Sequence, residues 1–185
     1  MKIVTLDFET YYDREFSLSK MSTEEYIADP RFHVILVAAK VNDGPVNWVH
    51  GKAVKPFLEG LDIPNSGIVC HNAMFDATIL QERYGLRPGV IFDTISMAQA
   101  HLRPFIPRIG LKYCLEYCDF DGLRKGEEVH NMLGRSYASL SRQELERYAE
   151  YCCTDVEGTY RLFKHLKPLF PRSEFQIMDM THRMY

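Results

Sequence analysis

Alternating hydrophobic and polar positions in the first half of the chain predict β-strands. Residues 1–8 (MKIVTLDF) place successive side chains on opposite faces of an extended chain, which is the period of a strand. The turn residues Asp43-Gly44-Pro45 separate two further runs and predict a hairpin between them. The predicted strands cover residues 1–8, 32–41, 46–50, 67–71 and 90–92.

Helical periodicity follows the fourth and fifth predicted strands and returns near the C-terminus. Asn72 is a candidate N-cap for a helix that ends at Gly85, and Asp93 or Thr94 would cap the next helix. A Ser-x-x-Glu capping box at 141–144 predicts the start of the longest helix, which Pro168 ends. The predicted helices cover residues 73–84, 94–101, 111–117, 142–167 and 174–185, and 119–137 is predicted to be a loop.

Composition limits what this α/β pattern can build. The chain has 185 residues, of which 46% are hydrophobic, enough for one packed domain. We expect that domain to cover residues 1–172, and residues 173–185 to begin a helix of a following region. The longest apolar run, 34–39, is far shorter than a membrane span, and the N-terminus lacks a signal-peptide pattern. These features predict a soluble intracellular chain with no membrane partner.

Charge and cysteine content exclude further classes. The net charge of -3 argues against a broadly basic duplex-DNA binder, although a local nucleic-acid site remains compatible with it. Five cysteines without a CxxC pair make neither a disulfide framework nor a cysteine zinc site, and buried thiols in a reducing compartment fit better. None of the seven histidines forms an H-x-x-x-H pair, so a catalytic histidine is not favoured.

Four acids and a tyrosine lie where three predicted elements can bring them together. Asp7 and Glu9 are two residues apart on the first strand, so they face the same side. Asp76 lies in the first turn of the helix after the fourth strand, and Tyr151 and Asp155 share one face of the longest helix. Each feature alone is ordinary, because strand ends, first helical turns and stripe edges often carry acids.

The four acids indicate a function only when they are considered together. Two carboxylates about 4 Å apart repel by roughly 4 kcal/mol at an effective dielectric constant of about 20, so such a cluster needs cations. Oxygen-only ligands suit Mg²⁺ or Mn²⁺. A pair of these ions supports phosphodiester hydrolysis, and Tyr151, one helical turn from Asp155, would orient the attacking water.

Three segments carry a family resemblance. The motifs LDFET (6–10), HNAMFD (71–76) and YCCTD (151–155) resemble those of the DEDDy 3′-5′ exonucleases. DFETYYD, EEYIADP and NDGPV resemble the proofreading domain of phage and bacterial family A DNA polymerases, and the resemblance extends over about residues 1–170. It implies an RNase H-like fold, with a central mixed five-stranded sheet, its second strand antiparallel, flanked by helices.

The resemblance also implies roles for particular residues. Asp7, Glu9 and Asp155 would ligate the first of two divalent cations, Mg²⁺ or Mn²⁺, and Asp7 would be shared with a second ion that Asp76 supports. Tyr151 would position the nucleophilic water. The residues implied to contact the terminal nucleotide are Thr10, Tyr11, Asn72 and Phe75.

The function implied is a metal-dependent 3′-5′ exodeoxyribonuclease that trims single-stranded DNA 3′ ends as a proofreading module, with polymerase domains in cis or in trans. It would act in the cytoplasm, that of the host if the protein is phage-encoded. The chain ends at Tyr185, before any polymerase fingers or palm, so it is not expected to polymerise. An RNase D-like RNA exonuclease and a non-catalytic nucleic-acid-binding domain remain alternatives.

Two basic segments are further candidates for strand contact. Arg103, Arg108 and Lys112 lie near aromatic residues, a mixture suited to single strands, although a solvated charged face is the more ordinary interpretation. In the predicted loop, a role in gripping the strand is a hypothesis for Arg124, Lys125 and Arg135.

Overall fold

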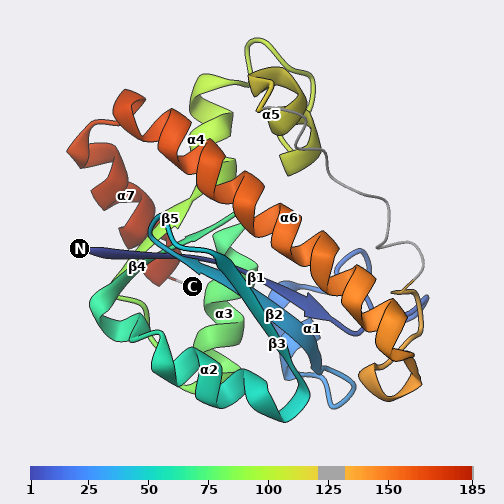
Figure 1. The fold of residues 1–185 in the computed structure, drawn as a ribbon. Helices are drawn as coiled ribbons and strands as arrows, with labels where there is room; N and C mark the ends of the chain where they lie inside the picture. The colour runs from blue at the N-terminus through green and yellow to red at the C-terminus, as the bar shows by residue number, and fades with distance from the viewer. Residues whose placement is uncertain (121–131, 185) are drawn as a thin grey trace.

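The computed structural model describes residues 1–120 and 132–184. Its centre is a five-stranded sheet in the order β3-β2-β1-β4-β5 (Figure 1). β1 and β2 are antiparallel, as are β2 and β3, whereas β4 runs parallel to β1 and to β5. The strands are β1 Lys2–Thr10, β2 Val34–Val41, β3 Val46–His50, β4 Ser66–Cys70 and β5 Val90–Asp93. This sheet confirms the predicted fold class.

The strand boundaries differ from the prediction mainly in β1. Residues 1–8 were expected, but the strand continues to Thr10, so Glu9 lies within the strand. β2 holds this end of β1 in place, because its ladder reaches Val34 opposite Thr10 after an irregularity between Glu9 and Thr10. The extra pairing gives both acidic side chains of β1 a rigid backbone.

The predicted helices are present, and two short helices are additional. The helices are α1 Thr23–Ala28, α2 Val54–Gly60, α3 Ala73–Tyr84, α4 Thr94–His101, α5 Leu111–Cys118, α6 Arg142–Leu166 and α7 Arg172–Arg183. α1 and α2 were not predicted, although a capping box between Ser22 and Glu25 starts α1 as another starts α6. Part of the predicted 119–137 loop, residues 121–131, lies outside the described residues, and residues 137–139 form a 3₁₀ turn.

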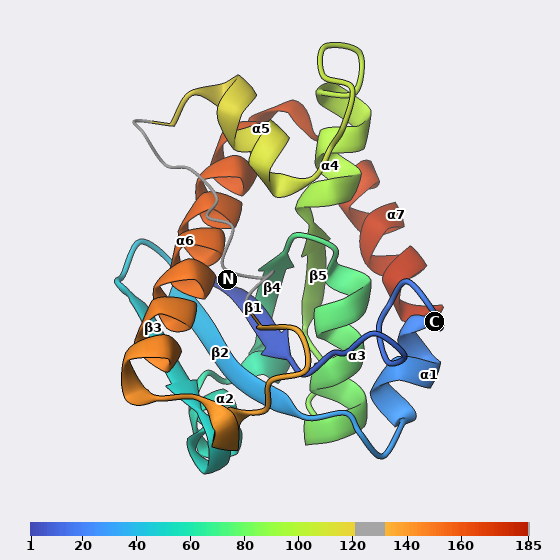
Figure 2. The ribbon, with the colours of Figure 1, turned by 90° about the vertical axis from the view of Figure 1, so that its right-hand side faces the viewer.

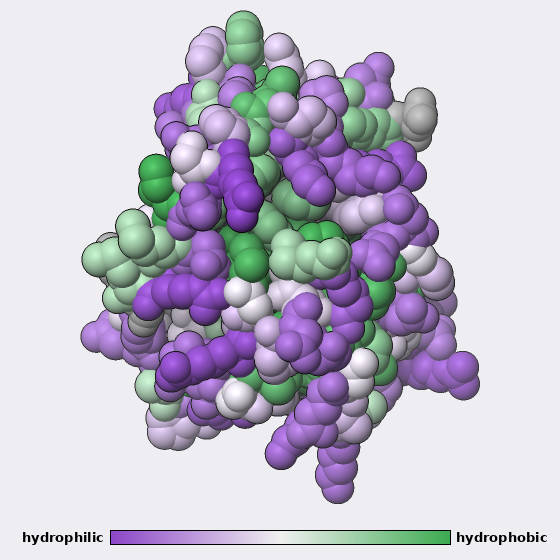
Figure 3. All heavy atoms as spheres, turned by 90° about the vertical axis from the view of Figure 1, so that its left-hand side faces the viewer, coloured by the Kyte–Doolittle hydropathy of each residue, from purple (hydrophilic) through white to green (hydrophobic). Residues whose placement is uncertain are grey.

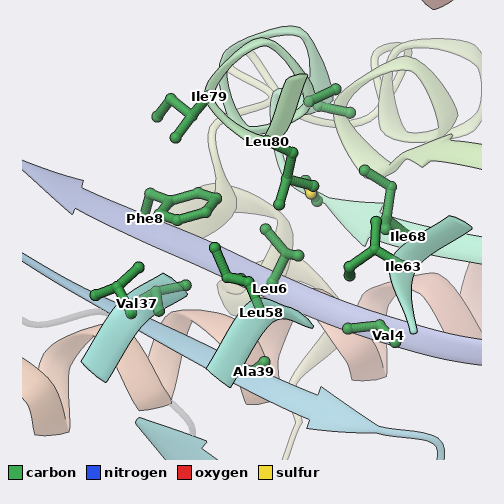
Figure 4. Close-up of a cluster of buried hydrophobic side chains, with 14 of the residues drawn as sticks. Val4, Leu6, Phe8, Val37, Ala39, Leu58, Ile63, Ile68, Ile79 and Leu80 are labelled. Carbon is green, nitrogen blue, oxygen red and sulfur yellow. The ribbon is translucent and has the colours of Figure 1, made fainter. Parts of the chain in front are cut away.

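Helices cover both faces of the sheet. α6 crosses one face of the sheet, while α1 and α3 lie on the other. In Figure 2 the end of β1 lies between α6 and α3. Leu6 and Phe8 of β1 belong to the buried cluster with Ile79 and Leu80 of α3 (Figure 4). Because successive side chains of a strand alternate, Asp7 and Glu9 point towards α6 instead.

α7 packs along the outer edge of the sheet. Its Met178 is buried, and its Asp179 accepts a 2.8 Å hydrogen bond from the backbone N–H of Ile91 in β5. The helix therefore adds a layer to the fold; that a further region follows it stays a prediction. The face of the molecule opposite the end of β1 is mainly hydrophilic, with smaller hydrophobic areas (Figure 3). Across residues 1–120 and 132–184, no helix has both the length and the apolar character needed to span a membrane.

Asp93 joins three helices at the end of β5. It is buried, and it accepts hydrogen bonds from the backbone N–H groups of Asn72, Ala73 and Ile95. Burial raises the pKa of Asp93, but hydrogen bonds from His182, from a serine hydroxyl and from the backbone outweigh it and lower the pKa to about 2. The charged carboxylate thus fixes the starts of α3 and α4 and the end of α7.

We predict that Asp93→Asn lowers the free energy of unfolding at neutral pH by roughly 2 kcal/mol, given about 1.4 kcal/mol per pKa unit between 3.8 and about 2. Because the folded-state pKa is depressed, this stabilisation is present above pH 3.8 and is lost as the pH falls towards 2. The measurement is urea unfolding between pH 7 and pH 3, with Glu59→Gln, a substitution at an exposed position, as the control. Equal losses in the two variants would contradict the assignment.

Candidate active site

The end of β1 extends beyond its neighbour β4. The parallel ladder between the two strands ends at Thr5 and Val69, and β4 itself ends at Cys70. Past that point the backbone N–H of Phe8 donates a 3.2 Å hydrogen bond to Oδ1 of Asp76, at the start of α3. The carboxyl group of Asp76 thereby occupies the position that a longer β4 would take, and its donor, Phe8, stands between Asp7 and Glu9 in the sequence.

Asn72 orients α3 through its backbone, and its side chain does not cap the helix as the sequence suggested. Its backbone adopts the left-handed conformation, with φ of 86°, and its side chain makes no capping hydrogen bond. Asp93 accepts from the first N–H groups of the helix instead. The prediction that Asn72 is the N-cap residue is correct in position, but the prediction of side-chain capping is wrong, because Asn72 has a left-handed backbone in place of the extended one from which a capping side chain reaches the helix N–H groups.

The environment of Asp76 disfavours its charge. The residue is 2% exposed, and burial is the main cause that raises its pKa well above the usual value; the negative charge of Asp7 adds to it. The hydrogen bond from Phe8 acts in the opposite direction but does not compensate. A cation between Asp7 and Asp76 would remove this repulsion.

α6 brings the second half of the candidate site over the end of β1. Tyr151 and Asp155 are buried on the face of α6 that packs against the sheet. Burial, followed by the charges of Asp155, Glu9 and Asp7, raises the pKa of Tyr151. All the predicted catalytic residues therefore lie in one electrostatic neighbourhood, with the Tyr151 phenol protonated.

Two further residues of α6 touch the β1 acids and were not predicted as site residues. Tyr148 is 2% exposed, donates a hydrogen bond to Oε2 of Glu9, and stacks on Tyr151 with ring centroids 6.3 Å apart. Cys152 approaches Oδ2 of Asp7 with its Sγ at 3.4 Å. In the sequence both residues belong to the hydrophobic stripe of a helix, which is why the pattern assigned them only to the core.

An apolar groove of about 340 Å³ opens beside Glu9. Its walls include Thr10 and Phe75, which were predicted to contact a terminal nucleotide, together with Tyr12 and Leu18, which were not. Aromatic walls of this kind accept a base by stacking. The groove therefore adjoins the acids at Glu9.

The other two predicted substrate contacts do not line this groove. The Tyr11 hydroxyl donates a 2.9 Å hydrogen bond to Asp13, and its ring stacks on His33 with centroids 4.9 Å apart. The next residue, Tyr12, lines the groove in its place. The side chain of Asn72 is exposed at the start of α3.

Of the basic candidates, the arginines in the described part of the chain contact other residues of the protein, Lys112 is exposed on α5, and two residues are not described. Arg135 forms a 2.6 Å ion pair with Glu144, the capping-box residue of α6. Arg108 donates a 2.9 Å hydrogen bond to the hydroxyl of Tyr113. Arg124 and Lys125 lie outside the described residues.

The donor set fits hard divalent cations. Asp7, Glu9, Asp76 and Asp155 offer only oxygen, as Mg²⁺ and Mn²⁺ prefer. Asp7, Glu9 and Cys152 each have one ligand atom within 4.8 Å of the others, and no other such group occurs in residues 1–120 and 132–184. The mutual repulsion of these buried acids favours the binding of cations.

This sheet order, with flanking helices and acids at the end of the central strand, is the RNase H-like exonuclease fold. The chain belongs to the 3′-5′ exonuclease family, which matches residues 2–170. No curated protein matches the sequence.

Several solved structures share the fold. Brucella melitensis NrnC with bound Mg²⁺ is 20% identical, with a TM-score of 0.65 over 98% of this chain and 84% of that chain. Trypanosoma brucei RNase D is 18% identical, with a TM-score of 0.63 over 89% of this chain and 57% of that chain. The family B DNA polymerase of Pyrobaculum calidifontis is 21% identical, with a TM-score of 0.59 over 91% of this chain and 25% of that chain.

These structural similarities establish the fold, and the match over residues 2–170 establishes the family. NrnC has also been solved bound to pGG, and RNase D in complex with RNA U12. The origin of this chain in a polymerase, its part in replication and its source in a phage are not supported by the comparisons.

We predict that Asp76→Asn stabilises the metal-free protein. Because the folded-state pKa of Asp76 is raised, the contribution of this residue to stability is greatest below pH 3.8 and decreases as the pH rises, while asparagine keeps the Oδ1 acceptor for Phe8. In EDTA at pH 8 the melting temperature should rise by several degrees, since ~1 kcal/mol corresponds to roughly 2–4 °C for a chain of this size. Thermal unfolding at pH 8 and pH 4 measures the effect, and a lower melting temperature at pH 8 would contradict it.

Proposed function

We propose that this protein is a metal-dependent 3′-5′ exonuclease that hydrolyses phosphodiester bonds one nucleotide at a time from the 3′ end of a single strand. One observation carries the proposal. Asp7 and Glu9 of β1 point towards α6, which supplies Tyr151 and Asp155, and Asp76 of α3 binds the β1 backbone between them.

In this proposal the four acids would hold two divalent cations. Asp7, Glu9 and Asp155 would hold the first ion, and Asp7 and Asp76 would hold the second. When bound, the pair of ions lowers the pKa of a water molecule and stabilises the leaving oxygen. The residues of the chain fix the carboxylate positions, which is why the backbone hydrogen bond to Asp76 and the tyrosine hydrogen bond to Glu9 matter.

Tyr151 and the groove position the reacting groups. The raised pKa of Tyr151 keeps its hydroxyl protonated, so it orients water through a hydrogen bond and does not act as a preformed phenolate. The groove beside Glu9 receives the terminal nucleoside, with its base near Phe75 and Tyr12. The adjacent carboxylates then lie next to the last phosphodiester bond, so hydrolysis releases the terminal nucleotide.

Short single-stranded RNA is the substrate with the most support. NrnC and RNase D, both similar in fold along most of this chain, have been solved with pGG and with RNA U12. Single-stranded DNA is the second candidate, supported by the resemblance of LDFET and the neighbouring motifs to polymerase proofreading domains. A proofreading role would require polymerase domains as partners.

Matched RNA and DNA oligonucleotides of one sequence, labelled at the 5′ end and incubated with Mn²⁺ or Mg²⁺, distinguish these substrates, because discrimination depends on the 2′-hydroxyl. We expect a ladder that shortens from the 3′ end, faster on RNA, and lost in EDTA. A faster ladder on DNA would favour the proofreading role. If the folded protein cleaves neither strand, the alternative of a non-catalytic binding domain is favoured.

Substitution of the acids should remove cleavage without unfolding the protein. We predict background activity for Asp7→Ala and Asp155→Ala, since each removes a proposed ligand of the first ion. Tyr151→Phe should lower kcat by roughly 10²–10⁴-fold, the range for a group that assists proton transfer, and leave KM nearly unchanged. Single-turnover rates on the preferred oligonucleotide provide the test. Full activity in both alanine variants would exclude the proposed centre.

Tyr148 should act as a positioning residue for Glu9. We predict that Tyr148→Phe weakens Mn²⁺ binding about 10–100-fold, as loss of a hydrogen bond to a metal ligand typically does. Tyr160→Phe is the matched control, because Tyr160 lies on the same helix and donates a 2.8 Å hydrogen bond to Asp43, away from the site. Calorimetric titration with Mn²⁺ compares the variants, and equal affinities would show that Tyr148 is only structural.

A further inference from the structure

A thiol lies among the carboxylates of the candidate metal centre. Cys152 is fully buried on α6, and its Sγ lies 3.4 Å from Oδ2 of Asp7. A carboxylate oxygen of Glu9 completes a group whose three ligand atoms all lie within 4.8 Å of one another. The centre of this chain therefore contains a soft donor beside its oxygen donors.

The spacing of these atoms suits a small tetrahedral ion. With zinc-to-sulfur and zinc-to-oxygen distances of about 2.3 Å and 2.0 Å, two ligands of one tetrahedral ion lie about 3.5 Å apart. The measured 3.4 Å between Cys152 and Asp7 matches that edge. The remaining pairs need to approach by at most about 1.5 Å, since none exceeds 4.8 Å and the tetrahedral edge between two oxygen ligands is about 3.3 Å.

We propose that Cys152 makes this centre a binding site for thiophilic divalent cations, Zn²⁺ or Cd²⁺, with Asp7 and Glu9 as the other protein ligands. The inference rests on the proposed function, because it assigns a further donor to the same centre. Thiolate ligands select these ions over Mg²⁺, which takes oxygen ligands. The thiol proton leaves to solvent when the sulfur binds the ion.

Such an ion competes with the catalytic cations. It would bind Asp7, the carboxylate that both catalytic cations would need. Zn²⁺ prefers tetrahedral coordination, whereas Mg²⁺ prefers octahedral coordination by oxygen. We therefore expect Zn²⁺ and Cd²⁺ to bind tightly and to inhibit, and a chelator that removes them to restore cleavage. The inhibition follows from occupancy and needs no change in the fold.

The chain supplies its own controls among the remaining cysteines. Cys153 follows Cys152 directly but lies half-buried on another side of α6. Cys70 is buried at the end of β4, where the nearest charges are Asp76 and Asp7. Neither belongs to the group of ligand atoms within 4.8 Å in the described part of the chain.

The test is a titration of the whole protein with Cd²⁺, monitored by the ultraviolet charge-transfer band of a cadmium–thiolate bond. Wild type, Cys153→Ser and Cys70→Ser should all develop the band at one equivalent. Cys152→Ser and Cys152→Ala should lack it and bind Cd²⁺ roughly tenfold or more weakly. Circular dichroism and Mn²⁺ binding confirm that both variants retain the fold and the carboxylates.

The outcomes separate this inference from the proposed function. A band that persists in both Cys152 variants, disappears in Cys70→Ser, or is absent from wild type that still binds Mn²⁺ overturns the role of Cys152 alone. Wild type that binds no Mn²⁺ overturns the metal-dependent function itself. In activity assays, relief of Zn²⁺ inhibition in Cys152→Ala would agree with the spectroscopic result.

Discussion

Electrostatic repulsion around Asp7 is the constraint on which the site depends. Burial is the main cause of the raised pKa of Asp76 and of Tyr151, and the negative charge of Asp7 adds to both. Acids do not gather in this way for stability, since burying charges of like sign costs free energy. The packed layers of α3 and α6 on the sheet hold them together, and cations are the natural compensation.

The fold achieves this with a strand that is longer than its neighbour. Because β1 continues past the end of β4, one edge of its backbone is available to Asp76, while β2 still pairs with the other edge. Alternation along β1 then gives its hydrophobic residues to the core with α3 and its acids to α6. One strand thus contributes side chains both to the hydrophobic core and to the candidate active site.

Local patterns predicted much of this arrangement. The pleat placed Asp7 and Glu9 on one face, and helical spacing placed Tyr151 and Asp155 together, because both follow from neighbouring residues. The hydrogen bond from Tyr148 to Glu9 joins residues 139 positions apart. No local period contains that contact, and a buried tyrosine in a hydrophobic stripe looks like any core residue.

Other errors have the same origin. Asn72 is of a residue type that favours helix capping, but its left-handed backbone does not allow its side chain to cap, and its own N–H donates to Asp93, 21 positions later. Tyr11 and Tyr12 are neighbours of the same residue type, and only contacts distant in sequence distinguish them: Tyr11 stacks on His33, and Tyr12 lines the groove. The choice between RNA and DNA is harder still, because it depends on a contact to a single hydroxyl group.

The central claim is that the acids around Asp7 bind two divalent cations. The most direct measurement is an anomalous difference map from crystals of the protein grown with Mn²⁺. The account predicts two peaks that share the carboxylate of Asp7, one also near Glu9 and Asp155 and the other on the side of Asp76. Peaks only at other surfaces, or none at saturating Mn²⁺, would contradict it.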